Sequence, residues 1–285
     1  MLSWNKHATY FFLRKFKLHN YECPRKFERQ VGSFRVQLAQ NPQDLVNSFQ
    51  LRSKVFHEEL RRQKNSMGMD ISSLDAVADH LLFWNDRKSE LIASVRLIQD
   101  PSEKHSPCQK EFYMDRVLDS DYRSKMEFGR LCVHPEYRNS FINAWIWTAI
   151  GEYCFMMGSD LLYGIASLRL RPNQEAARTY LQMIQQGHVA LSYFSHPRPE
   201  YQMQKLDPWM HFLRQNTSSL ETSFCEKIPP LLQSFLSAHG HIVSEPAWDP
   251  EFQCLDFLTM IPTQNLFRRF LGSQTRSLPS VPLTS

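Results

Sequence analysis

Glu127 and Arg130 have the residue types and the spacing that acid–base chemistry requires. A carboxylate can take a proton from an attacking amine, and a nearby cation or backbone N–H can stabilise the charge that develops on a carbonyl oxygen. Residues three apart in a regular strand face opposite sides, so the strand must bulge if both are to serve one site. Gly129 between them favours such a bulge. The alternative interpretation is an ion pair that only stabilises the strand.

A candidate anion site follows the same strand. The strand ends at Val133, and a turn containing Arg138, Asn139 and Ser140 leads into a long apolar helix, 141–157. Backbone N–H groups at a helix N-terminus point at a bound anion, and an arginine adds positive charge. Phosphopantetheine, the arm of coenzyme A and of acyl carrier protein, is a ligand of this kind. Many α/β proteins share this layout, so the turn alone indicates a phosphate site and no particular activity.

A second charged group surrounds an acidic loop at 61–79. It consists of Arg52, Asp75, Asp79 and Arg96. The aspartates can bind the ammonium groups of a small amino acid, and an arginine can bind its carboxylate. The alternative is an Arg–Asp network that orders the loop against the sheet, and the sequence does not choose between the two.

Hydrophobic periodicity places these residues on a mixed α/β framework. Each expected element has one apolar face or is apolar throughout, so a mixed β-sheet flanked by helices buries them all in a single domain. Strands are expected at 34–39, 80–84, 91–97, 127–133, 161–165 and 255–261, and helices at 41–60, near 112–118 and at 141–157, 173–185 and 228–238.

Composition narrows the class of protein. Of the 285 residues, 42% are hydrophobic and 22% are charged. The mean hydropathy of −0.44 argues against an integral membrane protein. The six cysteines are dispersed without a C-x-x-C spacing, which predicts no metal site and no redox motif and fits reduced thiols in the cytoplasm.

Positive charge is concentrated at the N-terminus. Residues 1–30 hold seven basic side chains against two acidic ones, whereas the whole chain has a formal net charge of only +4, which argues against nucleic-acid binding. As a helix this arm has an apolar side and a basic side, so it either lies on the anionic inner face of the cytoplasmic membrane or packs on its own body. A folded domain is expected at 31–271 and a disordered Ser-, Thr- and Pro-rich tail at 272–285.

The Val-His-Pro-Glu-Tyr-Arg segment at 133–138 is one of several motifs that occur in order along the chain. The others are Leu51–Glu59 with its R-x-x-V-F pattern, Asp70 and Asp75 in the acidic loop before Asp-His-Leu at 79–81, Arg96-Leu97, and the C-terminal segments 228–232, 245–252 and 256–258. Together they resemble the ornithine–acyl-carrier-protein N-acyltransferases, also called hemolysin-like acyltransferases. The resemblance covers roughly residues 35–270 and rests on many ordered matches.

The resemblance implies a GNAT-like fold, distantly similar to that of acyl-homoserine-lactone synthases. It implies transfer of a (3-hydroxy)fatty acyl group from acyl carrier protein to the α-amino group of ornithine, with no cofactor beyond this co-substrate. Glu127 and Arg130 would be catalytic, and the segment from Val133 to Ser140 would bind phosphopantetheine. Ser140 stands where the family usually has glycine, the residue that permits the closest backbone approach to a phosphate.

Two other functions remain open at this stage. The same fold can acylate a different amino acid or a homoserine-lactone precursor, and a non-catalytic membrane-binding hemolysin-like protein would need none of the matched charged residues. None of the 11 histidines is followed five positions later by aspartate, so the H-x-x-x-x-D motif of O-acyltransferases is missing. The expected product is therefore the mono-acylated lyso-ornithine lipid.

Overall fold

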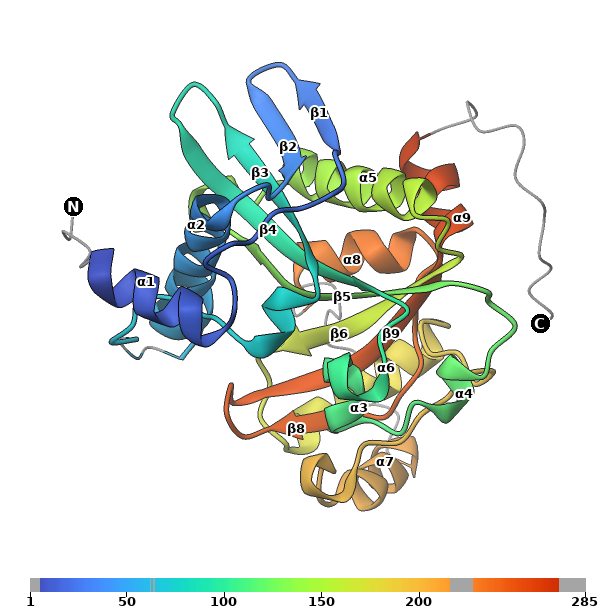
Figure 1. Cartoon of the computed structure of the whole chain (residues 1–285). Coiled ribbons are helices and arrows are strands. Elements are labelled where there is room, and N and C mark those ends of the chain that lie inside the picture. The colour runs from blue at the N-terminus through green and yellow to red at the C-terminus, as the bar shows by residue number, and fades with distance from the viewer. Residues whose placement is uncertain (1–5, 62, 64, 216–227, 272–285) are drawn as a thin grey trace.

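The computed structural model describes residues 6–61, 63, 65–215 and 228–271, so the predicted tail at 272–285 lies outside it. Within these residues a mixed sheet has helices on both faces (Figure 1). The strands are β1 (Glu28–Val31), β2 (Phe34–Leu38), β3 (Asp79–Asn85), β4 (Glu90–Gln99), β5 (Lys125–Val133), β6 (Leu161–Leu168), β7 (His241–Ile242), β8 (Ala247–Asp249) and β9 (Cys254–Pro262). The helices are α1 (Lys6–Lys15), α2 (Pro42–Arg52), the π-helix η1 (Ser53–Leu60), α3 (Pro107–Glu111), α4 (Asp115–Leu118), α5 (Ser140–Met156), α6 (Gln174–Gln185), α7 (Leu206–Gln215), α8 (Pro230–Ser237), α9 (Thr263–Leu266) and the π-helix η8 (Phe267–Leu271), with short 3₁₀ turns between some of them.

The strand order is β1-β2-β3-β4-β5-β6-β9-β7, and β8 also pairs with β9. Neighbouring strands among the described residues are antiparallel except β5 and β6, which run parallel and are connected by α5. The predicted mixed α/β sheet flanked by helices is therefore confirmed.

The two faces of the sheet carry different helices. Leu81 and Val95 face a large core that includes α5 and α8, whereas Leu82, on the other face, belongs to the cluster beneath α1 and α2. A third cluster, which includes Cys108 of α3 and Tyr163 of β6, lies under α3 and α4 on that second face. Tyr163 pairs with Glu127 of β5, and Glu127 pairs with Ile98 of β4, whose neighbour Leu97 faces the large core on the first face. The second face thus carries α2 and η1 over one half and α3 over the other.

Local sequence signals explain where the main helices begin. Asn41 caps α2, because its side chain accepts hydrogen bonds from the backbone N–H groups of Gln43 and Asp44, and Pro42 fits the first turn. Asn139 caps α5 in the same way, through the N–H of Ile142.

Some elements differ from those expected. The helix expected at 41–60 changes from α2 to a π-helix at Ser53. Helix α7 occupies a stretch around Pro208 that was not predicted as helical. Strand β1 was not predicted, because its four residues are all exposed and show no alternation of apolar and polar side chains. It crosses the expected boundary between residues 30 and 31.

The N-terminal arm packs on the body of the protein. Leu13 and Leu18 are buried in the cluster beneath α2, and Arg25 Nη2 lies 2.5 Å from Asp79 Oδ1. Tyr10 and Phe11 on the same helix are 54% and 64% exposed. One side of α1 is therefore core, and the other carries solvent-facing aromatic rings. In the described part of the chain, no helix is both long and apolar enough to cross a membrane.

Candidate functional site

The parallel strands β5 and β6 part halfway along their length. Their pairing ends at Phe128 and Gly164, although β5 continues to Val133 and β6 to Leu168. A Cβ atom on Gly164 would lie 2.5 Å from the carbonyl oxygen of Phe128, so only glycine permits the last close contact before the strands diverge. The parting exposes the edges of both strands at the centre of the sheet.

Glu127 lies just before this point and is 2% exposed. Ser106 Oγ donates to Glu127 Oε2 at 2.6 Å, and the backbone N–H of Cys108 donates to Oε1 at 3.0 Å. Burial raises the pKa of the Glu127 carboxyl above its usual value, although these hydrogen bonds oppose the shift. A carboxyl with a raised pKa is suited to exchange protons near neutral pH.

The bulge that the Glu-x-x-Arg spacing requires is present in β5. The register with β4 shifts between Ser94 and Arg96, and Arg130 takes the left-handed φ of 52°. Gly129 itself is not the left-handed residue. The bulge places the Arg130 side chain on the same face as Glu127, but the two bind different partners: Arg130 Nε lies 3.1 Å from Asp70 Oδ1.

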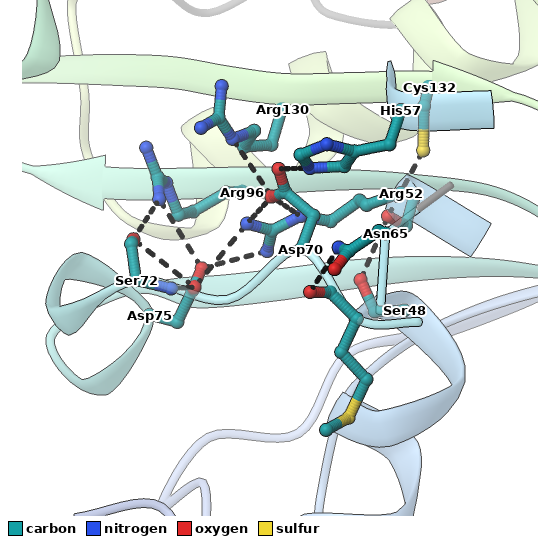
Figure 2. Close-up of polar contacts among 12 residues, drawn as sticks. Ser48, Arg52, His57, Asn65, Asp70, Ser72, Asp75, Arg96, Arg130 and Cys132 are labelled. Atoms are coloured by element: carbon teal, nitrogen blue, oxygen red, sulfur yellow. Dashed lines mark hydrogen bonds and ion pairs between the residues drawn. The ribbon is translucent and has the colours of Figure 1, made fainter. Parts of the chain in front are cut away.

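The second charged group forms a buried network on this face (Figure 2). Arg52, which is 1% exposed, donates to Asp70 Oδ1 at 2.6 Å and to Asp75 Oδ1 at 2.8 Å. Arg96 donates to Asp75 at 3.3 Å. Arg130 completes the set through Asp70, so three guanidinium groups face two carboxylates and one positive charge is in excess. This matches the predicted grouping of Arg52, Asp75 and Arg96.

The arginines keep both aspartates ionised. Burial alone would raise the pKa of Asp75, but Arg52 and Arg96 outweigh it and hold that pKa well below its usual range. Burial opposes Arg52 and Arg130 in the same way at Asp70, whose pKa is also well below the usual range. Burial lowers the pKa of Arg96 to about 10, so the side chain is still charged at neutral pH.

Asp79 does not join this network. It begins β3 with its side chain on the opposite face, where Tyr153 donates to Oδ2 at 2.6 Å and Arg25 pairs with Oδ1. His80, the next residue, faces the network and contacts the carbonyl oxygen of Asp75. The predicted pair of Asp75 and Asp79 is thus divided between the two faces of the sheet, and Asp79 holds the N-terminal arm to α5.

The predicted phosphate turn has the expected strand–turn–helix shape. Val133 ends β5, Asn139 caps α5, and Ser140 is its first residue. The guanidinium group of Arg138 donates to both carboxylate oxygens of Glu59 at 2.6 Å. In this state the positive charge of Arg138 is therefore balanced by a carboxylate of η1.

Some residues of the site were not singled out from the sequence. Asp70 was named only as part of the acidic loop. Ser106 precedes Pro107, a helix-start signal, in a segment for which no element was expected. Phe56 and Phe252 place their rings 5.6 Å from the Arg130 guanidinium carbon, on segments that no periodicity relates. A pocket of about 620 Å³ lies beyond the end of β5, and its lining includes Lys54, Lys88 and His134 but none of the predicted site residues.

Comparison with known proteins bears on the fold and on the class of enzyme. A family model described as an acetyltransferase (GNAT) domain matches residues 51–148, which span Arg52 to the first half of α5. Residues 51–148 are thus similar to an acetyltransferase (GNAT) domain. The predicted GNAT-like fold and the predicted acyltransferase class are therefore confirmed.

Two similar proteins align with most of this chain. An L-ornithine N(alpha)-acyltransferase of Rhodobacter capsulatus is 24% identical over 86% of this chain and 95% of its own. The enzyme of the same name from Rhizobium meliloti is 24% identical over 85% of this chain and 84% of its own. The resemblance stated from the sequence motifs is thus confirmed.

Solved structures align less closely. The AHL synthase LasI superposes with a TM-score of 0.49 and 10% identity, over 86% of this chain and 98% of its own. FeeM, an N-acyl amino acid synthase from uncultured soil microbes, superposes with a TM-score of 0.45 and 10% identity, over 88% of this chain and 99% of its own.

Proposed function

We propose that the protein transfers a (3-hydroxy)fatty acyl group from acyl carrier protein to the α-amino group of ornithine and so forms lyso-ornithine lipid. The observation that carries the proposal is the buried, hydrogen-bonded Glu127 carboxyl at the point where β5 and β6 part. The similarity to L-ornithine N(alpha)-acyltransferases over most of the chain supports the choice of acceptor.

The chemistry starts with a proton transfer. An α-ammonium group cannot attack a carbonyl carbon, so Glu127 takes one proton from it, directly or through water. The amine nitrogen then forms a bond to the thioester carbonyl carbon, and the C–S bond breaks when the tetrahedral intermediate collapses. The second amine proton leaves with the pantetheine sulfur as a thiol. Backbone N–H groups turned out of the ladder by the β5 bulge stabilise the oxyanion.

Arg130 is the member of the cationic network that a ligand can reach. Its side chain is 33% exposed, whereas those of Arg52 and Arg96 are 1% and 5% exposed. The excess positive charge of the network therefore faces outward at Arg130, which we assign to the acceptor's carboxylate. Arg52, Asp75 and Arg96 hold the loop and Arg130 in place.

The donor binds along the parted strands and the turn before α5. Acyl carrier proteins are acidic, and basic side chains are exposed around this region. Arg138 of the predicted phosphate turn is paired with Glu59, so Arg169, which is exposed directly after β6, is the alternative.

Incubating the purified protein with 3-hydroxyacyl carrier protein and a panel of amino acids tests this function. We expect mono-acylated ornithine as the product and a KM for the acyl carrier protein that rises with salt, because screening weakens charge steering. The protein with acyl-coenzyme A in place of acyl carrier protein is the matched comparison. Equal use of both donors, or a KM that does not change with salt, would contradict the choice of donor. Product on glycine, lysine or a homoserine-lactone precursor in preference to ornithine would select that acceptor instead.

We also propose that the exposed side of α1 touches the anionic membrane surface, where an amphiphilic product would be released. Replacing Tyr10 and Phe11 together by serine should weaken binding to anionic phospholipid vesicles without lowering the melting temperature, because both rings face solvent. Leu191→Ser, at a side chain that is 73% exposed outside the arm, is the control and should leave vesicle binding unchanged. Leu18→Ala should instead lower the free energy of unfolding by about 2–5 kcal/mol, since Leu18 is buried. Vesicle binding that is the same for the double variant and the wild type would exclude this contact.

A further inference from the structure

One aromatic side chain, Phe252, has no role in the steps above, although it contacts the cation that is assigned to the acceptor. Its ring centre lies 5.6 Å from the guanidinium carbon of Arg130, and the ring of Phe56 in η1 lies at the same distance. The two rings also contact each other edge to face, with their centres 6.3 Å apart. Two rings from distant segments therefore hold an arginine whose side chain is still 33% exposed.

These contacts leave part of the Arg130 guanidinium group available to a ligand. Its Nε lies 3.1 Å from Asp70 Oδ1, and the other end of the group points away from Asp70 (Figure 2). Aromatic rings attract a cation without using up its N–H donors. The two Nη atoms can therefore still donate to both oxygens of a planar carboxylate.

The backbone of Arg130 is held in an unfavourable conformation. Its φ of 52° lies in the left-handed region, which a residue with a side chain adopts only where surrounding contacts stabilise it. Asp70 and the rings of Phe56 and Phe252 supply such contacts. Strain of this kind at a residue other than glycine is typical of sites where one side chain is aimed at a ligand.

The turn between β8 and β9 is shaped to present the Phe252 ring. Asp249 ends β8 and is 8% exposed. Its Oδ1 accepts hydrogen bonds from the backbone N–H groups of Glu251 at 2.6 Å and Phe252 at 3.1 Å. Gln253 then takes the left-handed φ of 54° before β9 begins. An aspartate that binds the backbone two and three residues further on fixes a turn, so Asp249 sets the direction of residue 252.

Side chains of η1, and of the residue that follows it, contact the same turn. Arg61 Nη1 lies 3.2 Å from Glu251 Oε1, and the Arg61 guanidinium carbon lies 5.1 Å from the centre of the Phe252 ring. The ring of His57 is 6.5 Å from that of Phe252. The turn and η1 therefore meet at Arg130, so the ring is held from more than one side.

We propose that Phe252 is a positioning residue of the acceptor site, where it and Phe56 fix the Arg130 guanidinium group in the orientation that binds the acceptor's carboxylate. Asp249 acts one step further away, through the turn that presents the ring. This assignment rests on the proposed function, because it requires an amino acid as the acceptor. The turn between β8 and β9 thus determines the preference of the enzyme for acceptors that have a carboxylate.

The test compares L-ornithine with L-ornithinamide, in which a neutral amide replaces the carboxylate. Phe252→Ala should raise the KM for ornithine by a factor on the order of 3–30, as expected for one lost cation–π contact. It should change kcat for ornithine, and kcat/KM for ornithinamide, by no more than about twofold. Phe252→Tyr keeps the ring and should restore the wild-type KM. Phe194→Ala, at a half-buried ring that contacts His196, is the matched control and should leave both acceptors unaffected.

Asp249 provides a second pair of variants. Asp249→Ala removes the acceptor of both turn hydrogen bonds and should raise the KM for ornithine, as Phe252→Ala does. Asp249→Asn keeps a side-chain oxygen that accepts these bonds, so its KM should stay near that of the wild type.

An unchanged KM for ornithine in Phe252→Ala would overturn the proposal. An equal loss on ornithine and ornithinamide would also overturn it, because it indicates a structural role, and so would a wild type that uses the two acceptors equally. Calorimetric titration with each acceptor, without donor, measures binding directly. A wild type that binds ornithine selectively and more tightly than Phe252→Ala does, but acylates no amino acid, would refute the proposed function and leave this role of Phe252 standing.

Discussion

Glu127→Gln is expected to lower kcat by a factor on the order of 10²–10⁴, the usual contribution of a positioned general base. The amide keeps the shape of the carboxyl and an oxygen that can accept from the Cys108 N–H, but it cannot take a proton from the acceptor amine. The wild-type rate should rise with pH through the raised pKa of Glu127, because only the ionised carboxylate is a base. The variant should lose this dependence. Single-turnover rates across pH check both expectations.

Thermal melting separates this loss of activity from a loss of fold. Because the pKa of Glu127 is raised in the folded protein, folding favours its protonated form, and the wild type becomes less stable as pH rises through that pKa. The neutral variant should be at least as stable as the wild type at alkaline pH. Ser106→Ala, which removes one hydrogen bond that favours the ionised form, should shift the activity profile to higher pH and keep turnover. A variant at position 127 with near wild-type turnover and a lower melting temperature would make Glu127 a structural residue.

Part of this site was predictable because it depends on local order along one strand. The spacing of Glu127 and Arg130 within an apolar strand implied a bulge, and the structure has it. The details of the bulge depend on tertiary contacts. Arg130 takes the left-handed conformation beside glycine because Asp70 and two phenylalanine rings hold its side chain.

Other parts of the site depend on which face a side chain occupies. Asp75 and Asp79 are four residues apart in one loop, but β3 begins at Asp79 and turns that carboxylate to the opposite face. Phe252 and Arg130 are far apart in the sequence and meet only because β9 pairs with β6, the neighbour of β5. No periodicity encodes such a meeting, since it follows from the strand order.

The N-terminal arm also shows what its sequence alone could not predict. Its amphipathic pattern predicted one apolar face, and α1 has one, but an apolar face fits a membrane and a protein core equally well. Burial of Leu13 and Leu18 assigns that face to the core. Only the exposed rings of Tyr10 and Phe11 are left for a membrane.

Asp75→Ala is expected to lower the free energy of unfolding by about 3–5 kcal/mol, because it leaves Arg52 and Arg96 buried without their shared counter-charge. Asp86 provides the matched control, since it also pairs with an arginine, Arg35, but at the surface. Asp86→Ala should cost no more than about 1 kcal/mol. Chemical denaturation of the two variants and the wild type measures the difference.

The contribution of Asp75 to the free energy of unfolding should depend on pH in a defined direction. The pKa of Asp75 is lower in the folded protein than in the unfolded chain, where an aspartate titrates at about 3.9. Its contribution to stability is therefore complete above that value and is lost as pH falls below it toward the folded-state pKa. Wild-type stability should fall steeply with acid in this range, and the Asp75→Ala curve should be flatter, because one of the two depressed aspartates is gone while Asp70 is left. If Asp75→Ala cost no more than Asp86→Ala and its acid transition matched that of the wild type, the buried network would not be what orders the loop beneath Arg130.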